Sequence, residues 1–139
     1  MYKGHKAREL SINELSVGME VAFVERSYYV HRYTSWVLCK IEKLTPKKTK
    51  VTLDDGRTLK ANEYHTGLYH FEEWMKEESA LAAMDNDAIR TLYNMQNTDY
   101  TSFIASVSEK DMPEVYGHIV ALGNRIKEYK EKRKNKSWY

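Results

Sequence analysis

Apolar and polar residues alternate in short runs along the first part of the chain, as they do in half-buried β-strands. Two such runs are VGMEVAFV, which begins at residue 17, and WVLCKIEKL, which begins at residue 36. No run between residues 17 and 61 has helical spacing, so this stretch is predicted to be β. The residues expected on the inner face of the sheet are Met19, Val21, Phe23, Trp36, Leu38 and Ile41.

The clearest local signal is the run KVTLDDGRTLKA, in which two β-prone segments flank Asp55 and Gly56. Glycine at the second turn position takes the positive φ that a type I′ hairpin requires. The sequence therefore predicts a tight hairpin here. Ile12 and Leu15 precede the first strand and are expected to cover one end of the β-structure.

Four or five short strands, a long loop after the first and a late hairpin describe a small barrel. The segments LSVGMEVAFV, WVLCKIEKL and VTLDDGRTLKA resemble the SH3-like barrels of the Tudor, KOW and chromo type, over roughly residues 10–62. The resemblance implies a binding role, with a ligand groove or an aromatic cage formed partly by the loop after the first strand. Barrels of this kind bind nucleic acids, modified side chains or protein segments, so the likeness does not name the ligand.

The hydrophobic periodicity changes in HTGLYHFEEWMKEESALAAM, where apolar residues recur every three or four positions, as on one face of a helix. The glutamates of this run, Glu78 among them, are expected on the opposite, polar face. We expect this first helix to end before a second one that is capped by Asp85 or Asn86. A third, short helix is expected in DYTSFIASV, capped by Thr98 or Asp99.

The last helix is the best defined, because Asp111, Pro113 and Glu114 supply a cap, an early proline and an acid at the third position. Its apolar stripe is expected to be buried against the other helices or the barrel and consists of Val115, Ile119, Leu122, Ile126 and Tyr129. The chain is thus predicted to be an α+β protein with an SH3-like barrel in residues 1–66, a packed helical region of three to four helices in 67–130 and a frayed basic tail in 131–139.

At 139 residues, 42% of them hydrophobic, the chain is expected to form one domain or a small domain with an extension. The single cysteine, Cys39, excludes an internal disulfide framework and a multi-cysteine zinc site, and its apolar surroundings favour a buried small side chain. No apolar run approaches the roughly 20 residues that span a bilayer, and the first residues lack a signal-peptide core. A cytoplasmic protein without a membrane role is the expectation.

The net charge of +2 conceals an uneven distribution along the chain. Residues 1–70 carry 12 Lys or Arg against 8 Asp or Glu, residues 71–128 carry 5 against 11, and residues 129–139 carry 5 against 1. The basic first part makes a DNA mimic improbable. It permits contact with phosphates but does not demand it.

The loop SYYVHRYTSW holds four aromatic rings, a histidine and an arginine within ten residues. If it is extended, Tyr28 and Arg32 share one face, while Tyr29, His31 and Tyr33 share the other. A barrel of this size cannot bury every ring. The rings either pack over the barrel end, form a contact surface with the arginine in which a tyrosine stacks on a base, or converge as a methyl-ammonium cage.

Catalytic chemistry is not indicated. His65 and His70 lie five residues apart where strand gives way to helix, which is a poor spacing for a metal site without cysteine support. A cysteine inside an apolar strand is poorly placed to ionise, and neither a phosphate loop nor a paired-acid motif occurs. We therefore expect no enzyme activity, no catalytic residues, no metal and no cofactor.

A binding role remains, and two kinds of partner fit. We favour a protein partner: small size, abundant tyrosine and the lack of catalytic residues resemble virus-encoded accessory proteins that disable host enzymes or defence complexes. Such a regulator or inhibitor would dock on a host protein or nucleoprotein complex through the aromatic, basic loop and the acidic helices. The alternative is a nucleic-acid-binding protein that uses the basic barrel face and the tail. The candidate binding residues are Tyr28, Tyr29, His31, Arg32, Tyr33, Trp36, Lys47, Lys48, Lys50, Arg57, Lys132, Arg133, Lys134 and Trp138.

Overall fold

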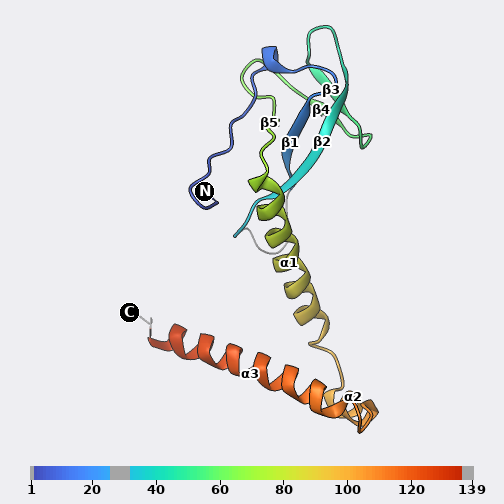
Figure 1. The fold of residues 1–139 in the computed structure, drawn as a ribbon, viewed down its shortest axis with the longest axis vertical. Helices are drawn as coiled ribbons and strands as arrows, with labels where there is room; N and C mark the ends of the chain where they lie inside the picture. The colour runs from blue at the N-terminus through green and yellow to red at the C-terminus, as the bar shows by residue number, and fades with distance from the viewer. Residues whose placement is uncertain (1, 26–31, 136–139) are drawn as a thin grey trace. The chain divides into compact units, whose positions relative to one another are not determined.

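The computed structural model describes residues 2–25 and 32–135, which fall into two compact units divided after Asn94 (Figure 1). The predicted α+β class is confirmed by a five-stranded antiparallel sheet and three α-helices in the described residues. The elements are η1 (Ile12–Glu14), β1 (Glu20–Glu25), β2 (Ser35–Leu44), β3 (Lys50–Leu53), β4 (Thr58–Lys60), β5 (Tyr69–His70), α1 (Trp74–Asn94), α2 (Tyr100–Ser106) and α3 (Met112–Asn135).

The sheet has the order β4-β3-β2-β1-β5, so the first four strands form a meander and β5 returns to the free edge of β1. Strand β2 is long enough to pair with β1 in its first part and with β3 in its second part. Its register shifts between Ile41 and Lys43, where the two halves of the sheet meet. Within the described residues no ladder joins β4 to β5, and closure into an SH3-like barrel stays a prediction.

Both faces of β1 and β2 are covered, which is why the alternation along them is incomplete. The main core includes the predicted inner residues Val21, Phe23 and Ile41, with Met19 packed against it. A second cluster on the opposite face joins Ala22 and Trp36 to Met75 of α1, with Leu38 at its margin. The expectation that Trp36 and Leu38 share a face with Ile41 was wrong. Ile41 faces the main core, whereas Trp36 and Leu38 lie on the opposite face, which α1 covers.

The predicted hairpin between β3 and β4 is confirmed, but its turn is of another type. Only Gly56 has a positive φ, of 90°, whereas a type I′ turn requires positive φ at two positions. The backbone N–H of Gly56 donates to the carbonyl of Leu53 at 3.0 Å, and the backbone N–H of Leu53 donates to the carbonyl of Arg57 at 2.8 Å. This is the geometry of a turn closed by one left-handed glycine.

Helix α1 is a single helix of 21 residues and does not break at the predicted cap, Asp85 or Asn86. Its buried residues Met75, Glu78 and Ala82 lie three and four positions apart, so they share one face, and this face packs on the sheet. Glu78 was expected on the polar side and is instead buried. Because α1 packs on the sheet, the first compact unit extends to residue 94, beyond the predicted boundary at 66/67.

In the second unit, Asp99 caps α2 as predicted, since its carboxylate accepts from the backbone N–H of Ser102 at 3.1 Å. Helix α3 starts at the predicted Met112 but continues to Asn135. The prediction that residues 131–139 fray is therefore wrong for 131–135. Basic side chains in the last turn of a helix interact favourably with its dipole, and Lys132, Arg133 and Lys134 lie there.

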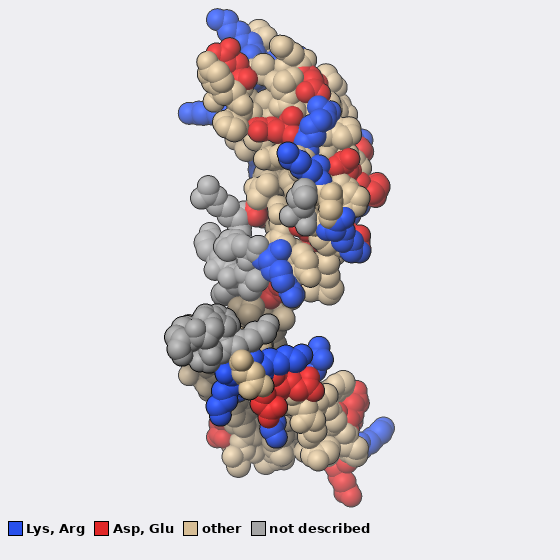
Figure 2. Space-filling view, turned by 90° about the vertical axis from the view of Figure 1, so that its left-hand side faces the viewer, with Lys and Arg blue, Asp and Glu red and all other residues tan. Residues whose placement is uncertain are grey.

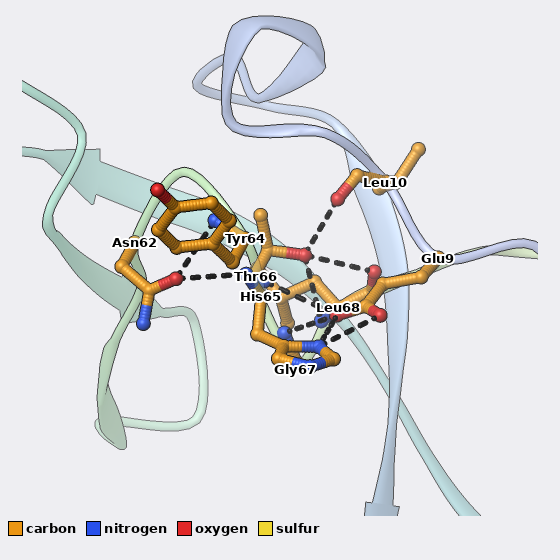
Figure 3. A network of polar contacts seen from close by, with 8 residues as sticks. All are labelled: Glu9, Leu10, Asn62, Tyr64, His65, Thr66, Gly67 and Leu68. Carbon is orange, nitrogen blue, oxygen red and sulfur yellow. Dashed lines mark hydrogen bonds and ion pairs between the residues drawn. The ribbon is translucent and has the colours of Figure 1, made fainter.

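A carboxylate fastens the N-terminal segment to the loop before β5 (Figure 3). The carboxylate of Glu9 accepts from the backbone N–H groups of Thr66 and Gly67 at 3.2 and 3.1 Å and lies 3.3 Å from His65 Nδ1. Thr66 Oγ1 donates to the carbonyl of Leu10 at 2.7 Å. The hydrogen bond from Gly67 is the main cause that lowers the pKa of Glu9. The contacts with His65 and Thr66 also lower this pKa, whereas the partial burial of the carboxylate raises it.

We predict that Glu9→Gln makes the stability of the first unit less dependent on pH. A carboxylate with a lowered pKa in the folded state contributes stability above its ordinary value of 4.5, and this contribution is lost as the pH falls through the lowered value. Denaturant unfolding at pH 7 should therefore give the variant a lower free energy of unfolding than the unchanged chain. This difference should shrink as the pH is lowered to 3. The same comparison in a His65→Ala background keeps the backbone donors and should give the same trend. A deficit that is equal at every pH would contradict this role.

Candidate functional site

A pocket in the first unit collects part of the predicted aromatic and basic loop. It has a volume of about 540 Å³ and lies between the N-terminal segment, the residues that lead into β2 and the first turns of α1. We call it the aromatic pocket. The residues that define it are Tyr2, His5, Arg32, Tyr33, Trp36 and Trp74.

The rings of the aromatic pocket contact one another. His5 stacks on Trp74 with centroids 5.2 Å apart and planes 7° apart, and Tyr2 stacks on it at 6.3 Å. Trp36 meets the same indole edge to face at 6.0 Å. Tyr33 meets Tyr2 edge to face at 6.1 Å. These pairings stabilise the packing of the N-terminal segment on α1 and occupy ring faces that a stacked ligand would need.

A buried acid ties the entrance of β2 to α1. The carboxylate of Glu78, which is 6% exposed, accepts from the indole N–H of Trp36 at 2.7 Å and from the backbone N–H of Thr34 at 3.1 Å. The neighbouring Ser79 Oγ accepts from the backbone N–H of Trp36 at 2.7 Å and donates to its carbonyl at 3.1 Å. A buried carboxylate is tolerated only with such partners. We call this arrangement the Glu78 clamp.

Two of the cations that line the pocket, Arg32 and Lys3, are paired with acids. The guanidinium of Arg32 forms two hydrogen bonds with the carboxylate of Asp85, at 2.6 and 3.0 Å, and lies 4.7 Å from the ring centroid of Tyr33. Lys3 Nζ pairs with Glu77 at 2.8 Å. The hydroxyl of Tyr2 has no hydrogen-bond partner within the described residues, and burial is the main cause that raises the pKa of this tyrosine.

Of the predicted binding residues that the structure describes, it brings three together at the aromatic pocket: Arg32, Tyr33 and Trp36. Trp36 is only 9% exposed and serves the core and the Glu78 clamp. Tyr28, Tyr29, His31 and Trp138 lie outside the described residues. The remaining predicted residues do not line the pocket and are Lys47, Lys48, Lys50, Arg57, Lys132, Arg133 and Lys134.

The basic residues of the sheet serve different local roles. Lys48 has a positive φ of 56° in the turn between β2 and β3, and its Nζ donates to the carbonyl of Asn13 at 3.4 Å. Arg57 lies 3.6 Å from Glu25 and 3.4 Å from Asp55, and stacks over Phe23. On the face shown in Figure 2, basic and acidic side chains are interspersed on each unit. This distribution gives a weaker field than a basic stripe would.

The groups that could suggest catalysis are used structurally. Burial is the main cause that raises the pKa of Cys39 to about 11, with Asp55 and Asp54 adding to it, so the thiol is uncharged at neutral pH and is a poor nucleophile. Asp54 accepts from the backbone N–H of Lys40 and Asp55 from that of Arg57, at 3.1 and 3.0 Å. Across residues 2–25 and 32–135, no group of three or more His, Cys, Asp or Glu side chains gathers as metal ligands.

A second candidate surface lies on the helices of the second unit. Neither α2 nor α3 contains a buried residue, and most of their large apolar side chains are exposed, whereas Met112 and Val115 are half-buried. An apolar groove of about 470 Å³ runs between them and is lined by Phe103, Ile104 and Ile119, among others. Of the stripe that was predicted to be buried, Ile119, Leu122, Ile126 and Tyr129 are exposed, and Val115 is half-buried. We define the helical apolar face as Phe103, Ile104, Ile119, Leu122 and Ile126.

Comparisons with protein-family models, with curated proteins and with solved structures gave no significant match. The function therefore has to be inferred from the residues of this chain. Within the described part of the chain, the helices lack the combination of length and hydrophobicity needed to cross a bilayer.

We predict that Trp36→Phe destabilises the first unit by about 1.5–3 kcal/mol, the usual loss when a hydrogen bond to a charged group is removed. The matched control is Trp74→Phe, which removes the same atoms from an indole that donates to the half-buried Glu72 at 2.8 Å. Water can replace that donor, so the control should cost less. Denaturant unfolding of both variants checks the difference. Equal losses would show that the Glu78 clamp does not hold the strand.

Proposed function

We propose that this chain is a non-catalytic binding protein that docks on a partner protein through the helical apolar face. A small regulator or inhibitor of a host protein or nucleoprotein complex would act in this way. The observation that carries the proposal is the exposure of Ile119, Leu122 and Ile126, at 46%, 41% and 40%, in helices without a buried residue.

A fully buried Leu or Ile side chain contributes about 1.5–3 kcal/mol relative to an exposed one, and α3 leaves several such side chains in water. Helices gain most of their stability from packing an apolar face rather than from intrinsic propensity. A contiguous exposed apolar surface on a protein commonly marks an interaction site. A protein partner that covers this face would supply the missing packing.

The first unit supports the same function in a different way. An antiparallel sheet whose fifth strand pairs with the first is compatible with the proposed SH3-like barrel, a fold that commonly serves binding. Arg32 and Tyr33 lie at the rim of the aromatic pocket and could add contacts to a partner. Because Arg32 is paired with Asp85 and the rings pack on one another, we assign the main interface to the helices.

Nucleic-acid binding is the second candidate, favoured by the basic end of α3. The five basic residues there are Lys127, Lys130, Lys132, Arg133 and Lys134. If they grip phosphates, affinity for an oligonucleotide must fall steeply between 50 and 200 mM salt, because bound counterions are released. Contact with an apolar protein surface would be far less sensitive to salt.

The test compares partner capture by the full chain with capture by Leu122→Asp combined with Ile126→Asp. We expect the full chain to capture a partner also after nuclease treatment, and the isolated partner to bind the unchanged chain saturably. Its affinity for the double variant should be at least tenfold lower, because each aspartate places a charge in an apolar contact. Isothermal titration with the isolated partner gives the affinities.

Lys47→Ala combined with Lys48→Ala is the control, since these residues lie in the turn between β2 and β3 of the first unit and should leave capture unchanged. Capture that is abolished by nuclease, or that persists in the double aspartate variant, would overturn the proposal. Circular dichroism of each variant establishes that its helices are retained.

A further inference from the structure

The apolar residues of α3 follow the heptad spacing of a coiled-coil helix. Counted from Met112, they recur at alternating steps of three and four residues, up to Tyr129 near the end of the helix. Successive steps of this kind place the side chains in one seam, at positions a and d of the heptad. The residues of the α3 seam are Met112, Val115, Ile119, Leu122, Ile126 and Tyr129.

The residue types in the seam suit a pair of helices. Ile119 and Ile126 occupy a positions and Leu122 the d position between them. A β-branched residue at a with leucine at d favours two-stranded packing. Arg133 occupies the next a position, so the apolar seam ends about three heptads after it begins.

The charges of α3 are sorted around the seam. The flanking e and g positions are Tyr116, His118, Gly123, Arg125, Lys130 and Lys132, and none is acidic. The acids of the helix, Glu114, Glu128 and Glu131, all fall at the outer c and f positions. Because e and g residues of paired helices face each other, they select the partner. A second copy of α3 in parallel would bring Arg125 of one helix against Lys130 of the other, which disfavours that pairing. An antiparallel copy would set this basic half against Tyr116, His118 and Gly123, which offer no acid for an ion pair.

We propose that the α3 seam binds one amphipathic helix of a partner protein that carries acidic residues beside its own apolar seam. This inference rests on the proposed function and specifies the chemistry of the partner. Basic flanks on α3 and acidic flanks on the partner form interhelical ion pairs, while the two apolar seams interlock.

The groove beside α2 adjoins the seam at Ile119. Ile119 belongs to the seam and also lines the groove with Phe103 and Ile104. A volume of about 470 Å³ with an almost entirely apolar lining accommodates large aliphatic or aromatic side chains of the bound helix. The groove thus provides an anchor beside Ile119, and the basic flank residues Arg125, Lys130 and Lys132 provide selectivity along the following part of the helix.

Two synthetic peptides of three heptads test the proposal on the full chain. Both have isoleucine at a and leucine at d, and they differ only at e and g, which are all glutamate in one and all lysine in the other. We expect the glutamate peptide to bind at least tenfold more tightly at low salt, measured by fluorescence anisotropy, and the preference to shrink as salt screens the ion pairs. Equal affinities would overturn the proposal.

Two matched charge-reversal variants test whether the preference for the glutamate peptide comes from the flanking positions of α3. Lys130→Glu with Lys132→Glu reverses two flanking charges, and Lys127→Glu with Lys134→Glu reverses two charges at outer b positions of the same helix. Both variants change the net charge by the same amount. The first should shift the preference toward the lysine peptide by at least tenfold relative to the unchanged chain, and the second should not. Equal shifts would show that only overall charge matters, contrary to the proposal.

The failure of this inference can be told from the failure of the proposed function. If the double aspartate variant of residues 122 and 126 loses the native partner while both peptides bind the unchanged chain equally, the interface stands and its acidic chemistry is wrong. If the native partner is unaffected by that variant, the proposed function itself fails. Light scattering that shows a stable dimer unable to bind either peptide would assign the seam to a second copy and overturn the inference.

Discussion

The arrangement of the first unit depends on a buried carboxylate. Glu78 projects from α1 toward β2 and is satisfied there by the indole of Trp36 and by the backbone of Thr34. An acid in this position would be strongly destabilising without those donors, so the helix can pack on the sheet only where the strand supplies them. The apolar contacts of Met75 and Ala82 on the same face add burial, but the clamp selects where along α1 the strand lies.

The second unit presents the opposite situation. Its helices have defined starts, with Asp99 capping α2, and yet no residue in α2 or α3 is buried. In the first unit, apolar faces on both sides of the strands are covered. In the second, an apolar face of comparable regularity is left in water. A chain that can build a two-sided core and leaves one face uncovered is more consistent with a binding surface than with poor packing.

The sequence was informative wherever periodicity alone decides the structure. The alternation around Val21 and Phe23 located the first strand, and the residue pair Asp55-Gly56 located the hairpin. The sequence-based predictions failed where the structure depends on which face of one element packs against another element. Glu78 looked like a solvent-facing acid, because a single sequence does not show that an indole N–H lies within reach of it. The order Ile119, Leu122, Ile126 identified an apolar stripe correctly, but periodicity does not reveal what covers it.

The uncovered helix has a further physical consequence. Glycine within a helix costs about 1 kcal/mol relative to alanine, and α3 contains both Gly117 and Gly123 with open space around their Cα atoms. In the proposed complex, a helix weakened in this way would gain order when a partner covers its seam, so part of the binding energy would be used for ordering. Such coupling would lower the affinity obtained from a given apolar area and leave discrimination to the charges beside the seam. On this proposal, the sorting of bases to the flanks of α3 and of acids to its outer side is the feature of the helix that would most influence partner choice.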